Sequence, residues 1–94
     1  MRELILTPNF KKVCHKFTQH HAKRQKRIEK TLEQMRIDVF ANYLDTHKRS
    51  GKLFGLLACS CGYNCRIVFQ IYQEPTTGKE FIVLLDIGTH DEVY

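Results

Sequence analysis

The sequence has no apolar run close to the roughly 20 residues that a helix needs to cross a bilayer. Its first residues, MRELILTPNF, lack the long apolar stretch and the small-residue cleavage site of a signal peptide. Internal repeats, low-complexity segments and a dividing linker are missing as well. We therefore expect a single domain, residues 1–94, located in the cytoplasm without membrane contact.

Familiar catalytic patterns are also missing: there is no Gly-rich phosphate loop, G-x-S-x-G elbow, carboxylate pair or HExxH motif. Acid–base chemistry without a metal or cofactor is the enzymatic alternative that the side chains support. RNA suits such chemistry because its 2′-hydroxyl is a built-in nucleophile. Histidine can transfer protons near neutral pH, and arginine can stabilise charge on a phosphate.

The positive charge is concentrated in the first half of the chain. Residues 1–52 carry 13 Lys/Arg against 5 Asp/Glu, whereas residues 53–94 carry 2 against 5, so the net charges are +8 and −3. A basic half favours a polyanionic partner such as nucleic acid, because phosphate contacts release counterions. A solvated helical surface, or a surface shaped for an acidic protein, explains the same asymmetry.

The first half predicts a strand and two helices. Residues 2–7 are predicted to form a strand that Pro8 and Asn9 close, and Asn9 is a candidate helix cap. Apolar residues then recur at helical spacing on both sides of a polar joint at residues 19–21. The first stripe consists of Phe10, Val13, Cys14 and Phe17, and the second of Ile28, Leu32 and Met35.

The second half changes to the period of strands after a connector at residues 38–51. Strands are predicted at residues 53–61, 65–72 and 81–87, joined by turns of hairpin length. The last strand is almost wholly apolar, which favours a central position covered on both faces. The predicted order is β-α-α-β-β-β, an α+β domain with a helical hairpin on a mainly antiparallel sheet.

The cysteine-rich segment CSCGYNC suggests a metal site at first sight. Cys59, Cys61 and Cys65 with a histidine would satisfy zinc in number, but the usual second Cys/His pair is missing. A disulfide is not expected in a reducing cytoplasm. We interpret the cysteines as small apolar residues packed within strands, and expect no metal.

Two of the five histidines are candidates for catalysis. His15, His20 and His21 lie among basic helical residues and are interpreted as surface residues. His47 and His90 lie in loops or strand ends rich in small or polar residues, where a histidine can donate or accept a proton. The alternative for each is an exposed loop histidine without a task.

The C-terminal half resembles the RelE/ParE superfamily of bacterial toxins, particularly its YafQ-like branch. The resemblance covers residues 46–94 in motif and rests on THKRSGKLFG, GYNCRIVF and, most specifically, IVLLDIGTHDEVY. It implies a RelE-like toxin fold, a metal-free endoribonuclease that cleaves messenger RNA in the ribosomal A site, and a cognate antitoxin partner. Operator DNA is expected to be bound only through the antitoxin complex.

The resemblance also implies roles for individual residues. His47 and His90 match catalytic histidines, Arg66 falls where an arginine stabilises the transition state, and Tyr94 takes a terminal aromatic position. Three further cations, which we expect to contact phosphates without reading sequence, are Lys48, Arg49 and Lys52.

Two positions depart from the YafQ-like pattern. Asn64 stands where an aspartate is usual, and Ser60 stands near the position of a further histidine. Since asparagine cannot take up a proton, the chemistry would fall more heavily on His47 and His90. A weaker nuclease, a variant mechanism and a detoxified antitoxin-binding module are each compatible with this change.

A second function class shares the expected fold: a ParE-like toxin that poisons gyrase and has no nuclease activity. Fold alone does not separate the two classes. Two loop histidines beside an arginine and a terminal aromatic favour the nuclease, because a gyrase binder has no need of them.

Overall fold

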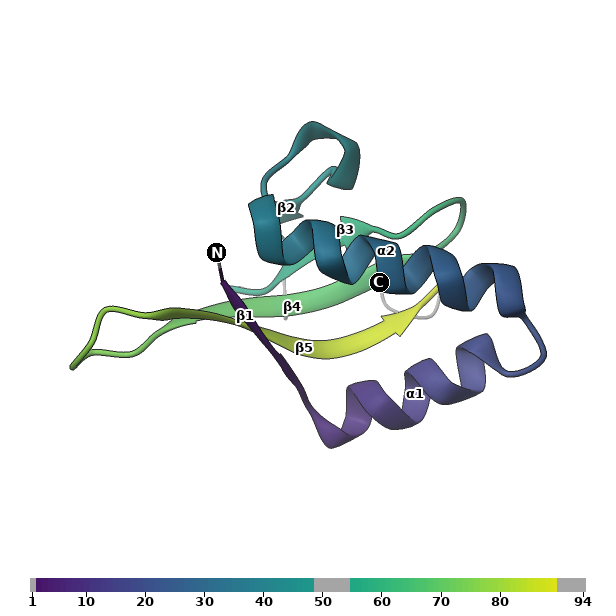
Figure 1. The fold of residues 1–94 in the computed structure, drawn as a ribbon, viewed down its shortest axis with the longest axis horizontal. Coiled ribbons are helices and arrows are strands. Elements are labelled where there is room, and N and C mark those ends of the chain that lie inside the picture. The colour runs from purple at the N-terminus through teal and green to yellow at the C-terminus, as the bar shows by residue number, and fades with distance from the viewer. Residues whose placement is uncertain (1, 49–54, 90–94) are drawn as a thin grey trace.

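The computed structural model describes residues 2–48 and 55–89. Strand β1 (Glu3–Leu6) leads into helices α1 (Pro8–Thr18) and α2 (Ala22–Asp38), and these are followed by the 3-10 helix η1 (Asn42–Leu44) and the short strand β2 (His47–Lys48) (Figure 1). The remaining strands are β3 (Leu57–Ser60), β4 (Arg66–Gln73) and β5 (Glu80–Gly88). The predicted order is confirmed, and η1 and β2 are additions to it. Within the described residues, no helix has the length and apolar character needed to cross a membrane.

The strands of the described residues form one sheet in the order β1-β5-β4-β3-β2. β1 pairs parallel to β5, and the other neighbours pair antiparallel, which confirms the mainly antiparallel α+β fold. The β4–β5 hairpin projects beyond the other elements (Figure 1). β5 is an interior strand, as predicted, but Val83 and Leu85 are only partly buried, so the expected cover on both faces is wrong.

Both helices contribute to a single core on one face of the sheet. The helices supply Phe10, Ile28 and Met35, and the alternating strand residues that meet them include Cys59, Ile67, Phe69, Ile82, Leu84 and Ile87. Because successive strand residues point to opposite faces, the neighbours of these residues lie on the face away from the helices. That second face, on which Ala58 and Val68 are also buried, carries the candidate functional residues His47 and Arg66.

Thr7 joins β1, α1 and β5. Its Oγ1 accepts a hydrogen bond from the Phe10 backbone N–H at 3.2 Å and donates one to the Leu84 carbonyl at 2.7 Å. Thr7 is therefore the N-cap of α1, and Pro8 occupies the first turn, where the missing N–H costs nothing. The expectation that Asn9 caps the helix is wrong: its side-chain amide donates to the Leu85 carbonyl at 2.8 Å.

We predict that Thr7→Ala lowers the free energy of unfolding by about 1–2 kcal/mol, because it removes the cap of α1 and the hydrogen bond to β5. Thr7→Ser retains the hydroxyl and should lose much less. Urea unfolding of the three proteins measures the difference. Equal stability of the alanine and serine variants would contradict the role given to this hydroxyl.

Candidate functional site

Two adjacent rows of paired residues lie on the face of the sheet that points away from the helices. In one row His47 pairs with Ala58, Ala58 with Val68, and Val68 with Asp86. In the next row, Arg66 pairs with Ser60 on one side and with Gly88 on the other. Paired residues of neighbouring strands point to the same face. The structure therefore brings His47 and Arg66 onto one face, with their Cα atoms roughly 12 Å apart by standard strand spacings.

The chain just before β2 orients the His47 ring. Nδ1 of His47 lies 2.9 Å from the Asp45 carbonyl oxygen, which can only accept, so Nδ1 is the nitrogen that carries the proton in the neutral ring. Asp45 has a φ of +50°, and Thr46 donates its hydroxyl to the Val39 carbonyl. Leu44, which precedes them, is buried in the core. These contacts present Nε2 of an exposed histidine as the proton-accepting atom.

Arg66 lies at the start of β4 and is partly buried. Its Nη1 donates to the Cys65 carbonyl at 2.8 Å and, at longer range, to the Gly62 carbonyl (3.4 Å) and the Ser60 hydroxyl (3.5 Å). Among the described residues, Nη1 makes all of the hydrogen bonds of this side chain. The turn between β3 and β4 thus fixes one corner of the guanidinium, and the other nitrogens retain their donors for a ligand.

The β3–β4 turn is closed by a disulfide between Cys61 and Cys65, whose Cα atoms lie 5.0 Å apart. The expectation that these cysteines are reduced is wrong, because the tight hairpin brings their side chains together. Asn64, in the turn, has a φ of +53°, a conformation that asparagine tolerates better than most residues. The backbone conformation of the turn therefore explains an asparagine at position 64 without a catalytic role.

The other two cysteines are free thiols packed as predicted. Cys59 is buried and donates toward the Met35 sulfur at 3.8 Å. Burial raises the pKa of the Cys59 thiol to about 12, although the nearby charge of Arg66 acts in the opposite direction. Burial also raises the pKa of Cys14. Within residues 2–48 and 55–89, no cluster of three or more His, Cys, Asp or Glu could hold a metal ion.

Several predicted site residues cannot be placed. His90, Tyr94, Arg49 and Lys52 lie outside the described residues. Lys48 is exposed and pairs with Leu57, so alternation along β2 points it to the face opposite His47. The roles of these five residues stay predictions.

The sequence analysis did not single out Asp86, which shares a row with His47 and lies diagonally across from Arg66. Diagonal neighbours of this kind are roughly 7–8 Å apart. Its carboxylate accepts the Ile87 backbone N–H at 2.9 Å. The signal for it was the single acidic residue within the apolar run FIVLLDIG, which breaks the pattern of a strand buried on both faces.

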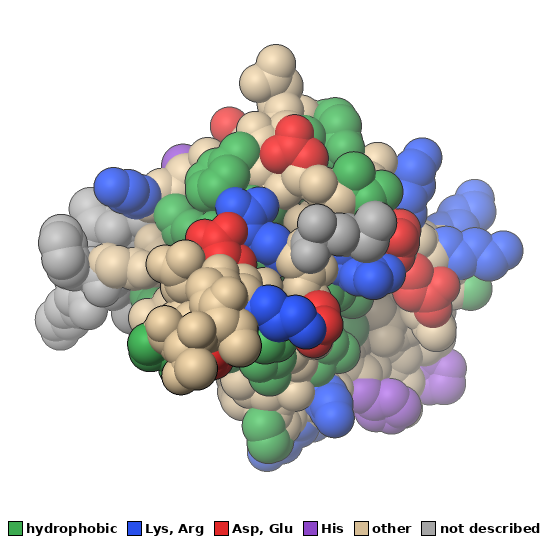
Figure 2. All heavy atoms as spheres, turned by 60° about the vertical axis from the view of Figure 1, so that its left-hand side comes forward, with side chains coloured by type: hydrophobic (Ala, Val, Ile, Leu, Met, Phe, Trp, Pro, Cys, Tyr) green, Lys and Arg blue, Asp and Glu red, His purple; other side chains and the backbone are tan. Residues whose placement is uncertain are grey.

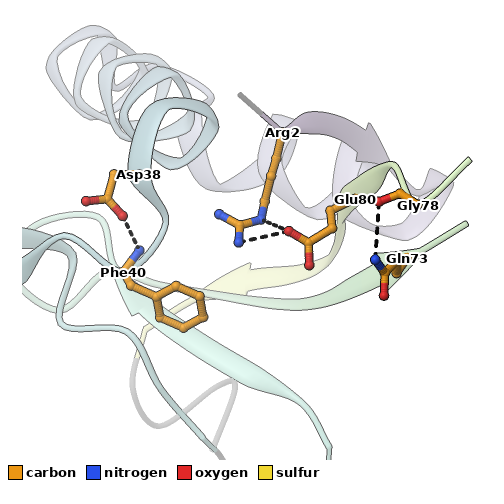
Figure 3. A network of polar contacts seen from close by, with 6 residues as sticks. All are labelled: Arg2, Asp38, Phe40, Gln73, Gly78 and Glu80. Atoms are coloured by element: carbon orange, nitrogen blue, oxygen red, sulfur yellow. Dashed lines mark hydrogen bonds and ion pairs between the residues drawn. The ribbon is translucent and has the colours of Figure 1, made fainter.

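Acidic and basic side chains pair at the projecting end of the molecule. Arg2 binds Glu80 at 3.0 Å, and Lys79 binds Glu3 at 3.3 Å (Figure 3 shows the first pair). Figure 2, which views this end, shows red and blue side chains side by side. The hollow that they line therefore has both signs of charge and offers no selective attraction to an anion.

No family model matches the sequence, and the comparison with curated proteins gives no significant match. Solved structures of bacterial toxins match over nearly the whole chain. The YoeB/ParE toxin from Agrobacterium tumefaciens has a TM-score of 0.74 at 15% identity, over 94% of this chain and 98% of that chain. YafQ from E. coli has a TM-score of 0.74 at 13% identity, over 100% and 99%.

A third match is the E. coli DinJ–YafQ toxin–antitoxin complex, with a TM-score of 0.69 at 13% identity, over 99% of this chain and 97% of that chain. The chain thus has the fold of the YoeB/ParE and YafQ toxins, which confirms the fold that its sequence resemblance implied.

We predict that the protein, purified without reductant and then denatured, has two reactive thiols, those of Cys14 and Cys59. Reduction should raise the number to four, the full cysteine content. Thiol labelling followed by mass spectrometry gives the count. Cys61→Ser should release its partner and give three labelled cysteines without reductant, and four labels on the untreated wild type would contradict the disulfide.

Proposed function

We propose that this chain is the toxin of a type II toxin–antitoxin pair, a YafQ-like member of the RelE/ParE superfamily that cleaves messenger RNA at the ribosome. The observation that carries the proposal is the presentation of His47: its Nδ1 is held by the Asp45 carbonyl, on the same sheet face as Arg66. The shared toxin fold and the basic first half of the chain support it.

In the proposed reaction, Nε2 of His47 takes the proton of an RNA 2′-hydroxyl. The O2′ atom then attacks the adjacent phosphorus and the bond from phosphorus to O5′ breaks. His90 donates a proton to the departing O5′. The products are a 2′,3′-cyclic phosphate and a 5′-hydroxyl. The RNA supplies the nucleophile and the leaving group, and the side chains supply the two proton transfers and the charge stabilisation.

Arg66 stabilises the charge that develops on the phosphate oxygens. Its guanidinium is held through Nη1, so little rearrangement is needed when the transition state forms. Tyr94 would stack on a base or orient the phosphate, and Arg49 and Lys52 would contact the backbone of the strand. Lys48 points to the face opposite His47, so it would contact the strand only where the RNA passes around the edge of the sheet. Asn64 cannot act as a base, which leaves proton transfer to the two histidines.

The proposed partner is a cognate antitoxin, as YafQ has in the DinJ–YafQ complex. Charge complementarity supports an acidic or amphipathic antitoxin segment that folds as it binds the basic half of the chain. Operator DNA would be contacted only through that complex.

We predict that the purified protein cuts messenger RNA within the reading frame when added to a translating ribosome mixture that contains a chelator. Loss of a general acid or base lowers rates by about 10²–10⁴-fold, so His47→Ala and His90→Ala should each lose cleavage to this extent. Mapping of the new RNA ends measures both position and rate. His15→Ala, an exposed histidine on α1, is the matched control and should cleave normally.

Full activity in both histidine variants would contradict the mechanism. A gyrase supercoiling assay tests the ParE-like alternative, with which the structural match to a YoeB/ParE toxin is compatible. Inhibited supercoiling without RNA cleavage would establish that alternative. If both assays were negative, Asn64→Asp would be tested next. Cleavage by this variant would indicate that the chain is a detoxified antitoxin-binding module that lost its activity with the carboxylate.

A further inference from the structure

A groove of about 270 Å³ separates α2 from η1 and from the β3–β4 turn. Its α2 wall is a single stripe, because residues three and four apart share one face of a helix. The stripe consists of Arg27, Lys30, Thr31 and Gln34. The facing walls are Tyr43 of η1 and, at the turn, Ser60 and Gly62. Neither His47 nor Arg66, the described catalytic residues of the proposed active site, is among the described lining of this groove.

The groove is positively charged. Its described lining residues include Arg27 and Lys30 but no Asp or Glu. The ion pairs found among the described residues are Arg2–Glu80, Arg36–Glu33 and Lys79–Glu3. Arg27 and Lys30 take part in none of them, in contrast to the paired charges at the projecting end seen in Figure 2. Two neighbouring cations without a counter-charge attract a phosphate.

Arg27 is held against the turn. A Cβ atom built at Gly62 would lie 2.5 Å from Arg27 Cδ and 3.0 Å from its Nη1, so only a glycine allows this approach. Gly62 also has a φ of +124°, which side-chain-bearing residues rarely adopt. The absence of a side chain at Gly62 therefore leaves the space in which the Arg27 side chain packs beside the turn.

Tyr43 adds an aromatic surface beside these cations. Its side chain is 61% exposed, while the next residue, Leu44, is buried and anchors η1 to the core. An anchored, exposed ring is a platform on which a nucleic-acid base can stack, whatever its identity.

The groove adjoins the proposed active site through the turn. Ser60 and Gly62, which line the groove, also accept the longer hydrogen bonds from Arg66 Nη1. A strand bound at Arg66 has only to continue past this turn to reach Arg27 and Tyr43.

We infer that the groove is a second binding site for single-stranded RNA, with a phosphate between Arg27 and Lys30 and a base against Tyr43. The inference deepens the proposed function, on which it rests for the identity of the strand. An acidic peptide is the other anionic occupant to consider. The groove favours RNA, because two neighbouring cations beside one exposed ring match a phosphate and a base, whereas the aliphatic and thiol side chains at its wall, Leu44 and Cys61, are already buried.

The test uses a short, fluorescently labelled 2′-O-methyl RNA, which cannot be cleaved because its 2′ oxygen is blocked. Removing both cations around the one proposed phosphate in Arg27→Gln/Lys30→Gln should weaken binding and reduce the slope of log K against log salt by roughly 0.7 for a single strand. The control Lys12→Gln/Lys16→Gln loses the same charge from exposed positions of α1 and should change neither. Fluorescence anisotropy at several salt concentrations gives both quantities.

Tyr43→Leu tests the stacking separately and should weaken binding roughly ten-fold. Tyr72→Leu, at an exposed tyrosine of the projecting hairpin, is its control. Each variant is checked for folding by circular dichroism. If the double variant does not fold, Lys30→Glu at an exposed helical position replaces it, with Lys16→Glu as control.

The inference is overturned if the groove variants bind RNA with the affinity and salt slope of their controls. It is also overturned if a glutamate-rich peptide binds more tightly than the RNA, depends on Arg27 and Lys30 and is indifferent to Tyr43→Leu. Because binding is measured without cleavage, a protein that lacks nuclease activity can still bind through the groove. Conversely, if the protein cleaves RNA but its groove variants bind RNA normally, the groove inference is wrong and the proposed function stands.

Discussion

The pairing of β5 with both β1 and β4 is the constraint on which the rest of the structure depends. It joins the two ends of the described chain, because the register places Leu6 beside Leu84. The Thr7 hydroxyl both caps α1 and donates to the Leu84 carbonyl, so the first helix starts at a fixed point on the sheet. Once α1 is placed there, Phe10 enters the core, and the candidate residues His47 and Arg66 lie on the opposite face of the sheet.

Local pattern predicted the elements of this fold, since helical and strand spacing are visible in any short stretch of sequence. Leu4 to Leu6, the Phe10 stripe and the apolar run of β5 each fall in the element expected of them. The parallel pairing of β1 with β5 depends on residues nearly eighty positions apart, and no local pattern contains it. The prediction of the helix cap failed for a related reason. Thr7 and Asn9 are both good capping residues, but their side chains also bond to carbonyls of β5, and these distant contacts determine which of the two caps the helix.

The sequence predicted which residue types form the candidate site, but not how these residues lie relative to one another. His47 and Arg66 were chosen for their side chains and motifs, and only the strand register shows that they share a face. Lys48 follows His47 directly, so it had to point the other way. The disulfide was missed because the argument came from the redox compartment, whereas the turn geometry brings Cys61 and Cys65 together.

The β3–β4 turn is where these constraints converge. Arg66 donates to its backbone, Arg27 packs against it, and Cys61 and Cys65 close it. Two cations from different elements, Arg66 of the sheet and Arg27 of α2, thereby contact the same short segment. Like charges repel, so such an arrangement is stabilised when an anion lies between or beside them. The turn therefore links the two proposed phosphate contacts, Arg66 of the proposed active site and Arg27 of the groove, through one short segment of backbone.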